Sequence, residues 1–309
     1  MDQEKILVIK HGALGDFVNS MGKMRAIRER HPDAYIALVT QKFLTGLAEK
    51  TKWFDEIIVD NRGYSFSSWW RIIKNTLADR RFDRIYDLQS NNRTLVRYRL
   101  LALFATRHPM RWGRLTKGGF NFITSPAKLP FTPHTTKIVH EDMEFPQPDL
   151  SGIHGDGKNF NLLPQRYALI IPGCSAGSPQ KRWPAERYRE VSMWLGERGI
   201  KSVVLGTKAE ADEISRVCRD NPFAVNFMGL CEIADIPDVA SRSEIVVGND
   251  TGPTHIARRT GKPTVIVFTA YDAARAAPKN APNVISLSGK NIEDISTEQV
   301  LDAVRRTVR

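Results

Sequence analysis

The chain has 309 residues, 41% of them hydrophobic, and a formal net charge of +11. This length suffices for about two domains with buried cores, and the composition is typical of a soluble globular protein. Three cysteines without Cys-x-x-Cys spacing predict neither a disulfide framework nor a zinc site. The N-terminus has no signal-type apolar core and no apolar run is long enough to span a membrane, so we expect a cytoplasmic protein.

The first predicted unit is a strand, a glycine turn and a helix between residues 5 and 31. Ile6–Ile9 is apolar and largely β-branched, as in a buried parallel strand. Gly12 and Gly15 allow a tight turn, and Asp16 stands where the helix begins. Asp16 is either a helix cap or a carboxylate at the edge where open α/β sheets bind ligands. Gly-x-Gly-x-x-Gly and Gly-Lys-Ser/Thr are both absent from this turn, which excludes the dinucleotide and Walker loops.

Strands and helices then alternate through the first half of the chain. Further strands are predicted at 34–39, 56–59 and 82–88, with helices at 42–50 and 69–80 and a basic amphipathic helix at 92–106. This order predicts a doubly wound sheet. From residue 108 the pattern weakens to loops, with one helix expected at 134–145. Proline and glycine gather in 146–164 and predict a linker there.

The same alternation resumes in the second half. Strands are predicted at 167–171, 201–205, 226–228, 244–247 and 263–268. Helices are predicted at 184–199, 209–219, 233–242 and 297–307, and a further helix follows the turn at 248–255 and ends at residue 260. We therefore expect two α/β domains, residues 1–160 and 161–309.

Most of the excess positive charge lies in one interval. No Asp or Glu occurs between Leu88 and His140, whereas basic residues are frequent. They include Arg93, Arg97, Arg99, Arg111 and Arg114. A local basic surface favours an anionic partner, which is nucleic acid, an anionic membrane or a phosphorylated substrate. The alternative is a solubilising face.

Two glycine-rich turns of the second half carry candidate chemistry. Residues 173–183 combine small hydroxyls, backbone N–H groups and the cations of Lys181 and Arg182, which together suit a phosphate. Residues 249–255 place hydroxyls and N–H groups at a helix start, with Asp250 and His255 as ligand-binding groups or as caps. An ordinary surface loop is the alternative for the first turn. No GxSxG elbow and no metal-binding motif occurs.

These motifs resemble glycosyltransferase family 9, the ADP-heptose:lipopolysaccharide heptosyltransferases. The resemblance covers the full chain and rests on Ile-Lys-His-Gly-Ala-Leu-Gly-Asp near the start, Lys-Arg-Trp-Pro, Gly-Asn-Asp-Thr-Gly-Pro-Thr-His and Gly-Lys-Pro-Thr-Val. It implies a GT-B fold of two Rossmann-like doubly wound domains facing across a cleft. The N-terminal domain would bind the acceptor and the C-terminal domain the nucleotide sugar. The last helix of such folds often packs back on the first domain.

The resemblance also implies an activity and residue roles. It implies inverting transfer of a heptose from ADP-heptose to a lipopolysaccharide core precursor, with no metal and no cofactor. Asp16 matches the general base and Lys181 the lysine on the donor phosphates. The donor-binding set is completed by Gly15, Ser175, Asp250, Thr251, Gly252 and His255. Ser175, Thr251 and Gly252 would hold the diphosphate, Asp250 would bond the sugar, and His255 would lie near the phosphates.

The basic interval then acquires a role in acceptor binding. The arginines named above would bind a phosphorylated glycolipid at the cytoplasmic face of the inner membrane. Three departures from the family pattern, Asn19, Gly22 and Thr269, leave the acceptor and the sugar open. The alternatives are a GT-B enzyme with another nucleotide sugar, an epimerase-like relative, and a non-catalytic protein that binds anionic lipid or nucleic acid. The sequence also leaves the oligomeric state open.

Overall fold

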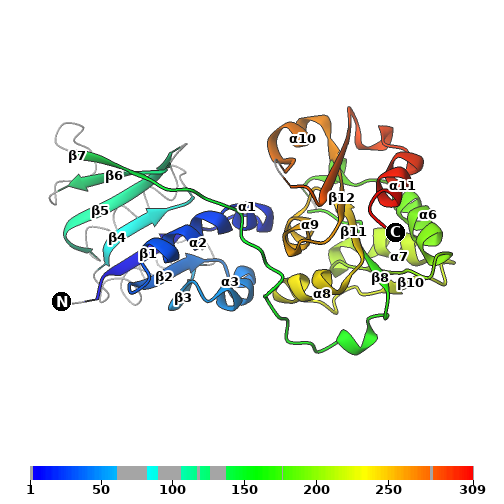
Figure 1. Ribbon diagram of the computed structural model, residues 1–309, viewed down its shortest axis with the longest axis horizontal. Helices are drawn as coiled ribbons and strands as arrows, with labels where there is room; N and C mark the ends of the chain where they lie inside the picture. Colours follow the sequence, from blue (N-terminus) through cyan, green and yellow to red (C-terminus); the bar gives the residue numbers. More distant parts are fainter. Residues whose placement is uncertain are drawn as a thin grey trace. The chain divides into compact units, whose positions relative to one another are not determined.

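The computed structural model describes residues 3–60, 82–89, 106–116, 119–125, 137–175, 177–278 and 281–308, with side chains described outside 106–142. The chain divides into two compact units, Met1–Pro148 and Asp149–Arg309 (Figure 1). The division lies inside the predicted linker but earlier than the predicted boundary at residue 160. The reason is that the linker is bonded to the second unit. The Leu150 N–H donates to the Arg259 carbonyl (2.8 Å), and the Asn159 amide donates to the Leu230 carbonyl (2.7 Å).

The first unit is built on one sheet with the strand order β3-β2-β1-β4-β5-β6-β7. Its strands are β1 (Lys5–Ile9), β2 (Tyr35–Thr40), β3 (Glu56–Val59), β4 (Phe82–Asp87), β5 (Thr106–Thr116), β6 (Gly119–Ser125) and β7 (Lys137–Asp142). The pairs among β1, β2, β3 and β4 are parallel, as predicted. The strand β5, which was not predicted, pairs parallel with β4, and the pairs β5–β6 and β6–β7 are antiparallel. β1 lies between β2 and β4, and its residues Ile6–Ile9 are fully buried because both faces of the sheet are covered.

The prediction for residues 108–164 was wrong in part. Loops were expected from 108 and a helix at 134–145, whereas the chain forms β5, β6 and the antiparallel strand β7 in this region. Residue 106, the last of the predicted basic helix, already belongs to β5. Phe120, Asn121 and Phe122 alternate with the two-residue period of a strand, a signal that the many surrounding turn residues obscured. The predicted helices at 69–80 and 92–105 lie outside the described residues.

The predicted helix after β1 is divided into α1 (Leu14–Asn19) and α2 (Met21–Arg30), and α3 (Thr45–Thr51) follows β2. The Ser20 hydroxyl donates to the Asp16 carbonyl (2.9 Å) at the junction of α1 and α2. A Cβ at Gly22 would lie 2.6 Å from the Pro146 carbonyl oxygen, so only glycine allows this approach of the chain to α2. The departure at Gly22 is therefore explained by backbone packing within the first unit.

The second unit has an all-parallel sheet with the order β10-β9-β8-β11-β12-β13 (Figure 1). Its strands are β8 (Tyr167–Ile171), β9 (Lys201–Val204), β10 (Ala224–Asn226), β11 (Ile245–Asn249), β12 (Thr264–Thr269) and β13 (Val284–Gly289). In sequence order this is 3-2-1-4-5-6, the doubly wound Rossmann arrangement. The order places β8 beside β11, where the chain reverses its direction of progress across the sheet.

Helices cover this second sheet on both faces. They are α6 (Ala185–Gly196), α7 (Ala211–Cys218), α8 (Ile236–Arg242), α9 (Gly252–Ala257), α10 (Ala270–Ala276) and α11 (Thr297–Arg305). α6 packs with α7 and α11, and α8 packs with α9. Val247 and Val267 of the strands join the core beneath α6 and α11, while Val246 and Ile266, which alternate with them, are equally buried on the other face.

Two elements of the second unit were not predicted, α10 and β13. α10 follows β12 without a loop, and β13 is an edge strand with alternating partial exposure. The last helix was predicted correctly in position, and α11 contacts α6, β12 and β13 of its own unit. Its packing on the first unit stays a prediction.

Candidate active site

The candidate site residues of the second unit lie at the carboxyl edge of its sheet. The segment 172–183 follows β8, and residues 250 and 251 follow β11. β8 and β11 are neighbours at the topological switch point, the place where open α/β sheets form their ligand crevice. The two glycine-rich turns singled out in the sequence therefore lie side by side.

Asn249 at the end of β11 joins these two turns. Its Oδ1 accepts hydrogen bonds from the Trp183 N–H (3.1 Å) and the Tyr188 hydroxyl (2.8 Å), and its Nδ2 donates to the Pro172 carbonyl (2.6 Å). Asn249 is completely buried, so an apolar side chain here would leave several polar groups unsatisfied. Asn249 is a structural residue, and the sequence marked it only by a polar amide at the end of an apolar strand.

Asp250 is the centre of an ionic cluster. Its Oδ2 lies 2.6 Å from the Lys181 Nζ, and its Oδ1 accepts from the His255 Nε2 at 2.8 Å. The Lys181 ammonium also lies 3.0 Å from Oδ1 of Asp272 in α10. The structure thus brings Lys181, Asp250 and His255 together as the sequence predicted, and it adds a second carboxylate that the sequence reasoning missed.

The charge states of this cluster follow from its contacts. Burial lowers the pKa of Lys181, but hydrogen bonds and charges of Asp250 and Asp272 outweigh it, so the net pKa is raised. Burial raises the pKa of Asp250, but His255 and Lys181 outweigh it, so the net pKa is lowered. At neutral pH the site therefore presents a protonated lysine against an ionised carboxylate.

His255 is held as one neutral tautomer. The Arg258 Nε–H donates to the His255 Nδ1 (3.2 Å), so the ring proton is on Nε2 and is donated to Asp250. Burial lowers the pKa of His255, and the nearby positive charge of Arg258 lowers it further, against the opposing effect of Asp250. His255 accordingly orients Asp250, and its expected place near the phosphates of a donor stays a prediction.

Arg182, the second cation of the segment 172–183, forms structural contacts within the second unit. Its guanidinium pairs with Glu213 and donates from Nε to the Cys174 Sγ (3.4 Å). Burial raises the pKa of the Cys174 thiol, which stays protonated. Of the two cations expected for a phosphate, Lys181 alone lies beside Asp250.

The remaining predicted donor-binding residues of the second unit lie near the start of α9 and in the turn after β8. Thr251 is the N-cap of α9, half-buried with Gly252, and its Oγ1 lies 3.3 Å from the Thr254 Oγ1. Ser175 is exposed, and its carbonyl accepts from the Ser178 N–H at 3.0 Å. Their hydroxyls and the N–H groups of this edge suit an anion.

The first unit carries Asp16 at the corresponding place, the carboxyl edge beside β1 and β4. Asp16 lies exposed in the first turn of α1, with Gly15 before it, and among the described residues its carboxylate has no hydrogen-bond partner. Gly12 has φ +116°, a conformation that favours glycine. A Cβ at Gly12 would lie 3.7 Å from both the Asp16 Oδ2 and the Gln89 Oε1, so these two side chains flank the turn.

Two glutamines that the sequence did not single out hold this turn. The Gln89 Oε1 accepts from the His11 N–H (3.1 Å), and the Gln41 Oε1 accepts from the Gly12 N–H (3.3 Å). Below them the His11 Nε2 lies 3.1 Å from Oδ2 of the buried Asp60. These contacts fix the backbone that leads to Asp16. The signal was weak, because a glutamine after a strand has no special local pattern.

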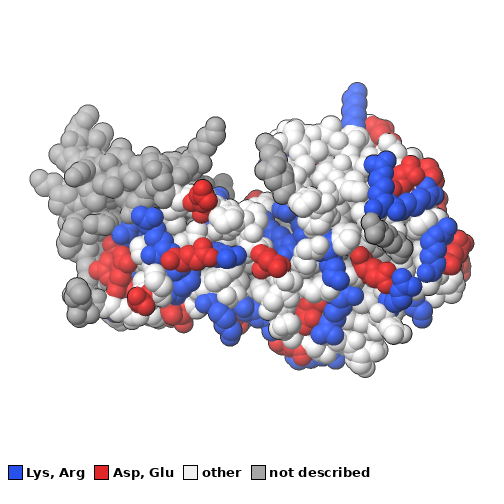
Figure 2. Space-filling model, in the orientation of Figure 1, with Lys and Arg blue, Asp and Glu red and all other residues white. Residues whose placement is uncertain are grey.

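The predicted acceptor-binding arginines are only partly placed. Arg93, Arg97 and Arg99 lie outside the described residues. Arg111 and Arg114 lie in β5, in register with Arg84 and Asp87 of β4, and not in the expected loop. Figure 2 shows acidic and basic side chains interspersed on the described surface in that view. The basic surface predicted for this interval stays a prediction.

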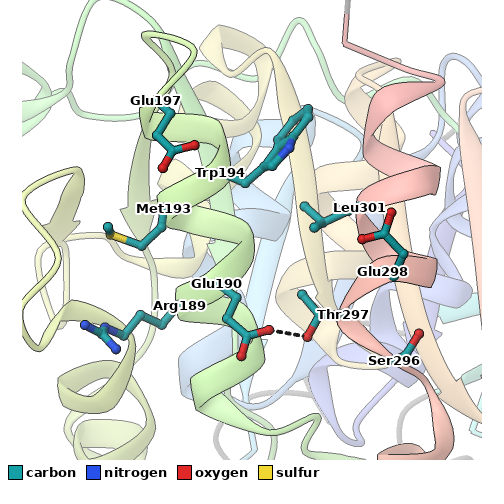
Figure 3. A pocket seen from close by; sticks show the side chains of 9 residues that line it. All are labelled: Arg189, Glu190, Met193, Trp194, Glu197, Ser296, Thr297, Glu298 and Leu301. Atoms are coloured by element: carbon teal, nitrogen blue, oxygen red, sulfur yellow. Dashed lines mark hydrogen bonds between the residues drawn. The ribbon is translucent and has the colours of Figure 1, made fainter.

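A groove on the second unit lies away from these residues. It has a volume of about 690 Å³ and lies between α6 and α11, lined among others by Met193, Trp194 and Leu301 (Figure 3). The Thr297 hydroxyl donates to Glu190 across it (2.5 Å). None of the candidate site residues lines this groove, so it contributes nothing to the site.

The described residues contain neither a metal-binding cluster nor a membrane-spanning helix. Within the described residues, no group of three or more His, Cys, Asp or Glu side chains is placed to hold a metal ion. No helix in that part of the chain has the length and apolarity needed to cross a bilayer.

The neutral state of His255 has a measurable consequence. Because its pKa in the folded protein lies below the ordinary value of 6.5, the unfolded chain binds the proton first as pH falls. The stabilising contribution is complete above pH 6.5 and is lost on acidification toward the lower folded pKa, by at most about 1.4 kcal/mol per pH unit. Denaturant unfolding between pH 7.5 and 5 measures it, and His255→Gln, which keeps a donor for Asp250, lacks this loss.

His154→Gln is the matched control. His154 is 78% exposed and lies 3.9 Å from Asp238, far along the chain from the cluster. This variant keeps the pH dependence of the wild type. An unfolding free energy that responds to pH identically in wild type and in His255→Gln contradicts a neutral His255.

Comparison with known proteins agrees with this arrangement. A family model described as glycosyltransferase family 9 (heptosyltransferase) matches residues 70–303. The lipopolysaccharide core heptosyltransferase OpsX of Haemophilus influenzae is 23% identical, and the match covers 94% of this chain and 86% of that protein.

Solved structures show the same fold. A glycosyl transferase of family 9 from Veillonella parvula superposes with a TM-score of 0.73 at 21% identity, covering 99% of this chain and 98% of that one. The E. coli heptosyltransferase WaaC with ADP-2-deoxy-2-fluoro heptose superposes with a TM-score of 0.67 at 13% identity, covering 98% and 99%. The predicted GT-B class with two Rossmann-like domains is confirmed.

Proposed function

Because the chain belongs to glycosyltransferase family 9 (heptosyltransferase), we propose that it moves a heptose from ADP-heptose to a lipopolysaccharide core precursor, with inversion and without a metal ion. The chain is a glycosyltransferase by family, and its relative in H. influenzae is a lipopolysaccharide core heptosyltransferase. The donor is proposed because the similar E. coli structure is described with an ADP-heptose analogue.

One observation carries the proposal, the pairing of Lys181 with Asp250 at the switch point of the second sheet. A protonated lysine is suited to the oxygens of a nucleoside diphosphate, and the paired carboxylate is suited to sugar hydroxyls. Thr251, Gly252 and Ser175 supply hydroxyl and N–H donors at the same edge. Positive charge and N–H donors would stabilise the negative charge that develops on the leaving diphosphate.

The proposed reaction is a single displacement. Asp16 accepts the proton from an acceptor hydroxyl while that oxygen forms a bond to the anomeric carbon of the heptose. The bond between that carbon and the diphosphate oxygen breaks, and its electron pair leaves with ADP. Attack opposite to the leaving group inverts the anomeric centre. Asp16 suits the role of base because its carboxylate is exposed and has no partner among the described residues.

The acceptor and the location of the protein are part of the same proposal. The predicted basic interval from Arg93 to Lys137 would attract a phosphorylated glycolipid at the cytoplasmic membrane surface. Sedimentation with anionic vesicles at low and high salt tests this part separately from the reaction. The transfer reaction itself does not depend on its outcome.

The test begins with titration calorimetry of ADP, UDP, GDP and CDP in the presence of a chelator. We expect selective binding of ADP, followed by transfer of heptose to a heptose-deficient core acceptor. NMR of the product identifies the anomeric configuration and shows whether the centre is inverted. Selective binding of another nucleotide contradicts the donor, and dependence of transfer on added metal contradicts the metal-independent mechanism.

A further inference from the structure

Lys181 is shared by two carboxylates, and the reaction proposed above uses only one of them. Asp250 lies 2.6 Å from the Lys181 Nζ, and Asp272 lies 3.0 Å from it. Both acids are nearly buried, with exposed fractions of 8% and 5%. A lysine ammonium has three N–H donors, so one stays available for a phosphate oxygen after these two contacts.

Asp272 is itself held in one orientation. It lies in the first turn of α10, directly after β12, and its N–H donates to the Thr269 Oγ1 (3.2 Å). The Thr269 hydroxyl in turn donates to the Asp272 Oδ2 (2.7 Å). With Oδ2 occupied in this way, Oδ1 is the oxygen that faces Lys181. The capping interaction of α10 therefore aims a carboxylate at the ammonium.

We propose that Asp272, oriented by Thr269, is the positioning residue that holds the Lys181 ammonium while Asp250 binds the donor sugar. This inference rests on the proposed function. Both oxygens of Asp250 already accept a hydrogen bond, Oδ2 from Lys181 and Oδ1 from His255, so new bonds from sugar hydroxyls would be shared with these contacts and would weaken the hold of Asp250 on Lys181. Asp272 is not required to bind the sugar in the proposed reaction, so its contact with Lys181 can persist when the donor binds.

Preorganisation is the physical benefit of this arrangement. A lysine has a long, flexible side chain, and ordering it only at the moment of reaction is unfavourable. A carboxylate that keeps the ammonium in place before and after the donor binds removes that penalty from the chemical step. The other charged groups around the pair are Arg275, 3.9 Å from Asp272, and Arg258, which acts on Asp250 through His255.

Asp272→Asn tests the inference in the full-length enzyme. The amide keeps the size of the side chain but removes one negative charge from Lys181. We expect the KM for the donor to rise about tenfold, because a charge-assisted contact is weakened. We also expect the basic limb of the pH profile of kcat/KM to move to lower pH, since one of the two groups that raise the Lys181 pKa is lost. ADP affinity by calorimetry, measured between pH 8 and 11.5, should follow the same shift.

Controls separate positioning from folding. Asp272→Glu keeps the charge and should restore most of the basic limb, and Thr269→Val, which leaves the carboxylate but removes its support, should show a partial effect. Asp294→Asn removes an exposed capping carboxylate, bonded to the Asn291 N–H (2.8 Å) outside the site, and should behave as wild type. An activity loss in Asp272→Asn that follows thermal stability, with an unmoved basic limb, overturns the inference.

The outcome also distinguishes this inference from the proposed function. If wild type binds ADP and transfers heptose, and Lys181→Met is impaired while Asp272→Asn is normal at every pH, only the inference fails. If wild type binds none of the four nucleoside diphosphates and transfers no heptose, the proposed function fails and the inference fails with it.

Discussion

Replacing Asp16 by Asn lowers kcat by about 10²–10⁴, the usual contribution of a general base, while ADP binding stays unchanged. Asn has the size of Asp but cannot take a proton from the acceptor hydroxyl. The side chain is exposed in α1, so the free energy of unfolding falls by no more than about 1 kcal/mol, from the lost favourable interaction with the helix dipole. Heptose transfer under single-turnover conditions and calorimetry with ADP measure the two quantities.

Asp33→Asn is the matched control for this variant. Asp33 is an exposed aspartate of the same unit, and it lies in the turn before β2, away from the glycine turn. It should retain wild-type kcat. An Asp16→Asn enzyme with more than about a tenth of the wild-type rate is incompatible with a role as base, since base catalysis is worth at least about 10².

Lys181→Met is expected to weaken ADP binding by about 10–100-fold, because a charge-assisted contact to the diphosphate is lost. It also leaves Asp250 and Asp272 without their shared cation. Two nearly buried carboxylates then repel each other, and we expect the free energy of unfolding at pH 7 to fall by about 1–3 kcal/mol. This is less than for a fully buried pair, since the Lys181 side chain is 21% exposed. Calorimetry and denaturant unfolding measure the two effects.

The acid dependence of this variant gives a further check. Protonation of either carboxylate relieves the repulsion, so the stability difference from wild type should shrink as pH falls toward the ordinary carboxyl range. Lys208→Met is the control, because Lys208 is an exposed lysine in the segment after β9 of the same unit. Equal ADP affinity of wild type and Lys181→Met would remove Lys181 from the donor site.

The strands and helices that the sequence predicted share one physical property. In β1, β8, β11 and β12 almost every side chain is buried, so the apolar run itself marks the strand. The helices α6 and α11 show an apolar face at helical spacing in the same direct way. The strands β5–β7 were missed because their pattern is short, interrupted by turn residues and equally compatible with loops.

Some residues of the candidate site could also be predicted from the sequence, and others could not. Asp16, Lys181, Asp250 and His255 could be found in the sequence, because each belongs to a glycine-containing segment that links a strand to the following helix. Asp272 could not be found in this way. Its partner Lys181 lies far from it in the chain, and the two meet only because β12 follows β11 in the sheet.

By itself the sequence determined the buried parallel strands such as β1, β8, β11 and β12, which turns carry polar groups and which family the motifs resemble, because these depend on residues close in the chain. The tertiary structure alone decided that Lys181 contacts two carboxylates, that His255 is a neutral support for Asp250 and that Gln41 and Gln89 hold the turn before Asp16. Apart from the contact of His255 with Asp250, five residues away, these contacts join segments distant in sequence. They depend on strand order and on hydrogen-bond geometry, which local periodicity does not encode.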